Sequence, residues 1–214
     1  MILKKLKPSQ HREGCWLVWL EDGSLFRIGE RDVIALGLYQ GRELSPTDME
    51  ALMQTQADHR LSQRAIHMLS TRPMSRKELV GKLSAASPAG QREQLESVAE
   101  AVADRMEELG LLNESQYAHT VVRYYAARGY GEKKIRTELY RRGVPRDAWE
   151  EALAQLSQEG DSLRPIDQLV HRKMGGAEPS RALLKKVSDY LARRGFGWEE
   201  ISSALARYAD RVEE

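Results

Sequence analysis

A helix–corner–helix segment that occurs three times constrains the fold of this 214-residue chain more than any other feature. The three copies begin at Leu69, Tyr125 and Leu191 and align without gaps, and each has an arginine at its fourth position followed by Gly or Pro. Glycine in a left-handed conformation, or proline, commonly ends a helix. In each copy two apolar residues four apart then predict a buried helical stripe: Leu79 and Leu83, Ile135 and Leu139, Ile201 and Leu205.

Each corner carries an apolar residue directly after the helix stop, namely Met74, Tyr130 or Phe196, which we expect to fill the bend. Ser75 and Glu78 have the spacing of a capping box, which predicts the start of a helix. Acidic helices are expected between the copies, so the units are three-helix modules. These helices span residues 93–109, 146–156 and 166–174, with loops at 84–91 and 175–179.

The first 57 residues have a different pattern. Residues 15–20 and 24–28 are typical of strands and flank Glu21-Asp22-Gly23, a strong hairpin signal. A further strand is expected around Leu3 and Leu6, and short helices at 30–38 and 47–57. The sequence therefore predicts a mainly α protein of tandem three-helix repeats with a small N-terminal α+β extension. The expected domains are residues 1–57, 58–112, 113–160 and 161–214.

Several function classes are disfavoured by the composition. The single cysteine, Cys15, excludes an intramolecular disulfide and is expected to be a small core residue. Five scattered histidines show no metal-ligand spacing, and Gly129-Tyr130-Gly131 is interpreted as a helix corner rather than a phosphate-binding loop. No apolar run approaches the roughly 20 residues of a membrane span, and no signal peptide is recognised. We expect a cytoplasmic protein that is not an enzyme and has no metal or cofactor.

Charge is segregated although the formal net charge is only +1. The segment 93–114 holds seven acidic residues, whereas 123–146 holds eight basic residues against Glu132 and Glu138. In the helix that follows the second corner, Ile135 and Leu139 face one side, and Lys133 and Arg141 face the other. This pattern favours a cationic surface for nucleic acid or an acidic protein, the alternative being a solvated helix face.

The candidate binding residues are the arginines and lysines of the three repeats. Arg72, Arg128 and Arg194 each stand last before a corner, where helix capping and partner contact are equally good interpretations. Trp149 and Trp198 are expected in the core. The full candidate set is Arg72, Arg76, Lys77, Arg128, Lys133, Lys134, Arg136, Arg141, Arg142, Lys185, Lys186, Arg193 and Arg194.

The repeated corner, the junction Gly110-Leu111-Leu112-Asn113-Glu114-Ser115-Gln116-Tyr117-Ala118 and the segment 191–197 resemble the RecX family, bacterial regulators of the RecA recombinase. The resemblance runs from about Arg60 to the C-terminus. It implies an elongated, curved array that binds the RecA–single-stranded-DNA filament as a monomer. It also implies negative modulation of the ATPase, strand-exchange and co-protease activities of RecA in DNA repair and the SOS response.

Two other functions stay open. A DNA-binding module that acts without RecA would bind naked DNA with a steep salt dependence. A structural scaffold is the third, since helical repeats often bind proteins alone. The N-terminal hairpin is expected to cap the repeat array, with docking to a partner as the alternative.

Overall fold

The computed structural model describes residues 1–85, 92–158 and 165–213. It begins with the antiparallel strands β1 (Leu3–Pro8), β2 (Cys15–Leu20) and β3 (Leu25–Gly29), paired in the order β1-β2-β3. The predicted hairpin and the further strand are confirmed. Gly23 adopts a positive φ of 87°, and the Asp22 carboxylate accepts hydrogen bonds from the backbone and hydroxyl of Ser24, which closes the turn.

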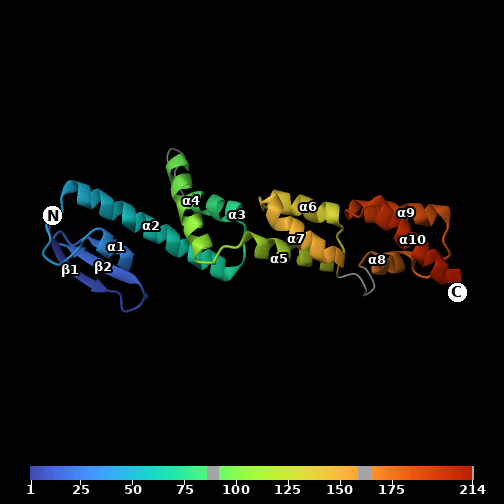
Figure 1. Ribbon diagram of the computed structural model, residues 1–214, viewed down its shortest axis with the longest axis horizontal. Coiled ribbons are helices and arrows are strands. Elements are labelled where there is room, and N and C mark those ends of the chain that lie inside the picture. Colours follow the sequence, from blue (N-terminus) through green and yellow to red (C-terminus); the bar gives the residue numbers. More distant parts are fainter. Residues whose placement is uncertain (86–91, 159–164, 214) are drawn as a thin grey trace. The chain divides into compact units, whose positions relative to one another are not determined.

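One face of this sheet is covered by α1 (Glu30–Ala35) and α2 (Pro46–Thr71) (Figure 1). The core between them is formed by alternate strand residues and by apolar side chains of the helices and their connections. It consists of Leu3, Val18, Leu20, Phe26, Ile28, Val33, Leu38, Leu44 and Leu52. Cys15 is a buried free thiol, as expected.

The helix predicted at 47–57 is much longer than expected, because α2 continues to Thr71 and crosses the domain boundary expected at residue 57. No Gly or Pro lies between Pro46 and Pro73, so nothing in the sequence stops the helix earlier. Its N-terminus is well defined. The Ser45 hydroxyl accepts a hydrogen bond from the backbone N–H of Asp48, and the Asp48 carboxylate accepts one from that of Ser45.

The rest of the chain is helical, with its stops at the predicted corners. The helices are α3 (Arg76–Ser84), α4 (Arg92–Glu108), α5 (Glu114–Ala127), α6 (Glu132–Arg141), α7 (Arg146–Gln158), α8 (Pro165–Met174), α9 (Arg181–Arg193) and α10 (Trp198–Glu213). The predicted loop at 175–179 is free of helix and strand, whereas most of the loop expected at 84–91 lies outside the described residues.

The chain divides into two compact units, residues 1–72 with 79–111 and residues 73–78 with 112–214. In the second unit, α5, α6 and α7 share one core, and α8, α9 and α10 share another. Ile135, Leu139 and Ile201 are buried there, which confirms these stripe positions, whereas Leu205 is only half-buried.

The two tryptophans expected in the core have different environments. Trp149 is buried in the core of α5–α7, as predicted. The prediction for Trp198 is wrong, because 72% of this residue is exposed. Trp198 is the first residue of α10 and lies a turn ahead of Ile201, the first buried residue of that helix. Helical periodicity identifies a buried face, but not how far the face is covered at the end of a helix.

Candidate anion-binding groove

The predicted cationic side of α6 is present, with Lys133 and Arg141 exposed and Ile135 and Leu139 fully buried. Both arginines of α6, Arg136 and Arg141, are nevertheless paired. Arg136 donates to Glu132 at 2.7 Å and to Glu150 of α7 at 3.1 Å. The excess of eight basic over two acidic residues counted along segment 123–146 therefore overstates how much of this positive charge is unpaired. The sequence count missed Glu150 because it lies outside the basic segment.

These ion pairs shift the titration of their members. The hydrogen bond to Glu150 raises the pKa of Arg136, and the bond to Glu132 adds to it. Burial by itself would raise the pKa of Glu138, but the hydrogen bond and the charge of Arg141 outweigh it and lower this pKa below 4.5. Arg136 thus joins α6 to α7 through Glu150, whereas the pair of Arg141 with Glu138 lies within α6.

Glu138 gives a pH-dependence that can be tested. Because its pKa is lowered by folding, the carboxylate stabilises the protein above about pH 4.5, and this contribution is lost as the pH falls through the folded-state pKa. We expect Glu138→Gln to lower the free energy of unfolding by roughly 1–3 kcal/mol at pH 7. Urea unfolding from pH 7 to pH 3 should show the difference from wild type shrinking. A difference that does not change with pH would contradict this role.

A groove of about 740 Å³ opens beside the end of α6 and the start of α7. Four of its lining side chains are cationic, and no carboxylate is among the described residues that line it. The lining residues are Lys77, Arg136, Tyr140, Arg141, Gly143, Val144, Arg146 and Trp149. The structure thus brings together three of the predicted site residues, Lys77, Arg136 and Arg141. Arg146, Tyr140 and Trp149 also line the groove but are not in the candidate set, although the basic segment 123–146 contains Arg146 and Tyr140.

Lys77 reaches the groove because residues 73–78 pack on the middle module, which consists of α5, α6 and α7. The buried Ser75 hydroxyl accepts from the backbone N–H of Glu78 at 3.1 Å, which confirms its capping role, and also donates to the carbonyl of Arg142 at 2.5 Å. The stem of Lys77 lies where a Cβ at position 143 would be, so only glycine fits there. The sequence showed the cap but gave no sign of this packing.

Two aromatic residues give the groove further binding chemistry. The Tyr140 side chain is highly exposed, so its ring is available for stacking. The Trp149 residue is 7% exposed, and its Nε1 is buried without a hydrogen-bond partner among the described residues. An indole N–H is a donor only, and it would be satisfied by an acceptor oxygen. Cations, a stacking surface and an unused donor together suit a phosphate or carboxylate ligand.

The remaining predicted site residues fall into three groups: structurally engaged, half-buried and exposed. Arg194 is structural: its guanidinium donates to the carbonyls of Arg128 and Gly129 and lies 5.1 Å from the Tyr130 ring centroid. Arg142 is likewise engaged, donating to the Tyr117 hydroxyl. Arg76 and Lys134 are half-buried. Exposed side chains belong to Arg72, Arg128, Lys133, Lys185, Lys186 and Arg193.

The corner arginines therefore do not share one role. Arg72, Arg128 and Arg194 all occupy C-cap positions, as expected. Arg128 stacks on the exposed Tyr124 ring, 3.7 Å from its centroid. Arg194 instead joins the second corner to the third, where the Gly131 N–H also donates to the carbonyl of Arg194 at 2.9 Å.

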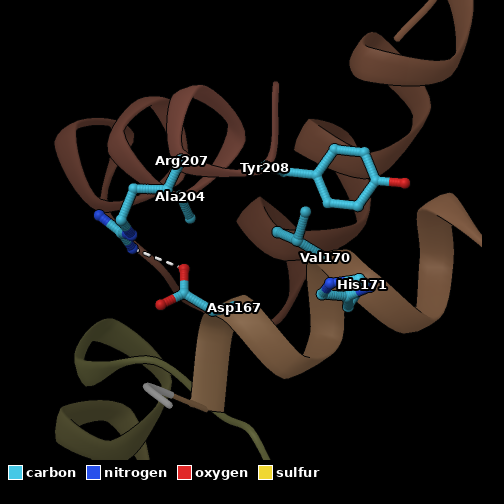
Figure 2. A pocket seen from close by; sticks show the side chains of 6 residues that line it. All are labelled: Asp167, Val170, His171, Ala204, Arg207 and Tyr208. Atoms are coloured by element: carbon cyan, nitrogen blue, oxygen red, sulfur yellow. Dashed lines mark hydrogen bonds and ion pairs between the residues drawn. The ribbon is translucent and has the colours of Figure 1, made fainter. Parts of the chain in front are cut away.

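A second concave site lies in the last module but is too small for a ligand. Its volume is about 10 Å³, and Figure 2 shows Arg207 of α10 directed toward Asp167 of α8 beside it. The two side chains form an ion pair of 2.6 Å, and only 12% of the Asp167 side chain is exposed. This pair ties two helices together.

Replacing only one partner of this ion pair should destabilise the folded protein. We expect Arg207→Ala to lower the free energy of unfolding by about 1–3 kcal/mol, because the carboxylate of Asp167 loses its partner while mostly buried. In the double variant with Asp167→Ala, part of the loss should be recovered. Thermal unfolding of the single and double variants measures both. A double variant less stable than both singles would contradict this account.

Among the described residues, no group of His, Cys, Asp and Glu side chains could hold a metal ion. No helix in that part of the chain is long and apolar enough to cross a membrane.

Comparison with known proteins decides the family. The models of the second and third three-helix domains of RecX match residues 113–153 and 166–205. The regulatory protein RecX of Xanthomonas oryzae pv. oryzae is 36% identical over 143 residues, covering 66% of this chain and 84% of the relative. The chain belongs to the RecX family. RecX of Pseudomonas entomophila is 34% identical over 146 residues, which cover 87% of that relative.

Solved RecX structures show the same fold. One crystal structure of regulatory protein RecX matches with a TM-score of 0.75 at 22% identity, covering 94% of this chain and 98% of the other. RecX from Lactobacillus salivarius matches with a TM-score of 0.62 at 20% identity, covering 72% of this chain and 97% of the other. The mainly helical fold with RecX three-helix domains is thereby confirmed. The RecX family is a family of regulatory proteins.

Proposed function

We propose that this RecX-family protein is a negative modulator of RecA that binds the RecA–single-stranded-DNA filament. In this proposal it acts as a cytoplasmic monomer and lowers the ATPase, strand-exchange and co-protease activities of RecA during DNA repair and the SOS response. The observation that carries the proposal is the cationic groove on the middle module of a chain that belongs to this regulatory family.

The groove supports this function by its charge and by its construction. Lys77 is exposed and forms no ion pair with any described residue, so its ammonium group can bind a phosphate or carboxylate at little cost. Arg146 is also exposed, and its ion pair with the exposed Glu150 is weak enough to be exchanged for an external anion. Arg141 is exposed and adds positive charge to the groove while it stays paired with Glu138. Cations on the neighbouring α9, Lys185 and Lys186 among them, would extend contact along a polymer and strengthen binding.

The test is the ATP hydrolysis of RecA on single-stranded DNA, titrated with this protein, with binding to naked DNA measured in the same buffer. We expect inhibition at less than one molecule per RecA protomer and weak binding to naked DNA. Strong, salt-sensitive binding to naked DNA without any effect on RecA would replace this proposal by an autonomous DNA-binding module. An absence of both activities would leave only the scaffold interpretation.

A further inference from the structure

The N-terminal sheet has a second face that the helices do not cover. Its strands contain four cationic residues and no acidic residue. The register places Lys5 opposite Trp19, Lys7 opposite Leu17, and Leu17 opposite Arg27. Since side chains alternate along a strand, these residues share the face opposite to the Val18, Leu20 and Phe26 core.

Trp19 lies at the centre of this open face. The ammonium groups of Lys5 and Lys7 are 5.5 and 5.4 Å from its ring centroid, and Leu25 is its partner on β3. Trp19, Leu17 and Leu25 are half-buried, whereas Lys5 and Arg27 are exposed. The face thus combines an aromatic ring that has two ammonium groups over it with a third cation, Arg27, on β3.

Acidic groups near the sheet do not cancel this charge. The Glu21 carboxylate accepts from the backbone N–H of Ile2, and that of Asp22 is bound within the hairpin turn by Ser24. Both lie at the turn that joins β2 to β3, beyond the strand residues of the face. The cations on the open face, Lys5, Lys7 and Arg27, form no ion pair with any residue that the structure describes.

We propose that this open face binds single-stranded nucleic acid, independently of the groove on the middle module. A base would replace the Lys5 and Lys7 ammonium groups over the Trp19 ring and stack on it, and the two displaced lysines, with Arg27, would contact the neighbouring phosphates. Unpaired bases leave their rings free for stacking, whereas the bases of a duplex are already stacked on each other. An acidic peptide would use the cations but not the indole surface. The aromatic centre of the face therefore favours single-stranded nucleic acid over both a duplex and an acidic peptide.

The experiment measures the affinity of the full chain for a fluorescein-labelled oligothymidylate by anisotropy, without RecA, at several salt concentrations. We expect Lys5→Glu with Lys7→Glu and Arg27→Glu to weaken binding at least tenfold and to reduce the salt slope by about 2. The matched control is Arg31→Glu with Arg60→Glu and Arg64→Glu, which changes the net charge equally at exposed residues outside the face. It should retain most of the affinity.

The indole is tested separately from the charges. Trp19→Ala should weaken binding roughly tenfold, and Trp19→Phe should recover part of it, since a smaller ring still stacks. Circular dichroism checks that each variant is folded, and Trp19→Phe keeps the test valid if the alanine variant is not. Equal losses in the two charge triples, unchanged binding by folded Trp19 variants, or equal affinity for duplex DNA or polyglutamate would each overturn the proposal. Because RecA is absent, these outcomes are independent of RecA regulation.

Discussion

Charge reversal at Lys77 and Arg146 is expected to weaken inhibition of RecA by roughly a hundredfold. Both side chains are exposed, line the groove and lie on different segments, so their reversal replaces two attractions with two repulsions on one surface. A hydrogen bond to a charged group contributes about 1.5–3 kcal/mol, and two such losses reach this magnitude. The concentration of Lys77→Glu, Arg146→Glu protein that halves the ATPase rate of RecA on single-stranded DNA measures the effect.

A matched control separates the groove from net charge. Arg60→Glu with Arg64→Glu changes the formal charge by the same amount on the exposed surface of α2. We expect this variant to inhibit RecA nearly as well as wild type. Similar losses in both variants would show that only the overall charge matters, and the groove would then have no special role.

Replacing Gly195 by alanine is expected to give the largest loss of stability, about 3–5 kcal/mol. Its backbone has a φ of 90°, which costs a residue with a Cβ roughly 1–2 kcal/mol. In addition, the new Cβ would lie 2.5 Å from the backbone nitrogen of Lys134, where the second and third corners meet. The Gly195 carbonyl accepts a hydrogen bond from the Lys133 N–H at 3.1 Å in this contact, so the corner cannot easily move away.

Thermal unfolding distinguishes the steric contact from the backbone strain. For a domain of this size we expect Tm to fall by about 10 °C in Gly195→Ala. Gly176 has a similar φ of 77°, but nothing lies within 4 Å of where its Cβ would be. Gly176→Ala should therefore lower Tm by only a few degrees. Equal shifts in the two variants would mean that the packing of the corners contributes nothing.

The sequence predicts the elements better than the contacts between them. The Asp22-Gly23 turn and the corner glycines are local signals, so the hairpin and the helix stops at Gly129 and Gly195 are where they were expected. The packing of the third corner on the second depends on residues 66 apart in the chain, and local patterns hold no information about it. For the same reason, the sequence around Arg194 does not indicate that its guanidinium binds the carbonyls of Arg128 and Gly129 in another module.

The candidate site was likewise only partly predictable. Helical periodicity correctly placed Lys133 and Arg141 on the exposed side of α6. It could not show that Glu150, on the next helix, pairs with Arg136, or that the packing of Ser75 brings Lys77 beside Gly143. A count of charges along the chain treats all cations alike, whereas folding divides them into paired and available ones.

The most direct test is the affinity of the wild-type chain for three targets at one salt concentration: RecA filaments on single-stranded DNA, the same DNA without RecA, and RecA without DNA. We predict that the filament is bound far more tightly than either component, and that Lys77→Glu with Arg146→Glu removes this preference. Affinity for the filament no greater than for naked DNA, or a preference that survives charge reversal, would contradict the proposal that this groove acts on the RecA filament.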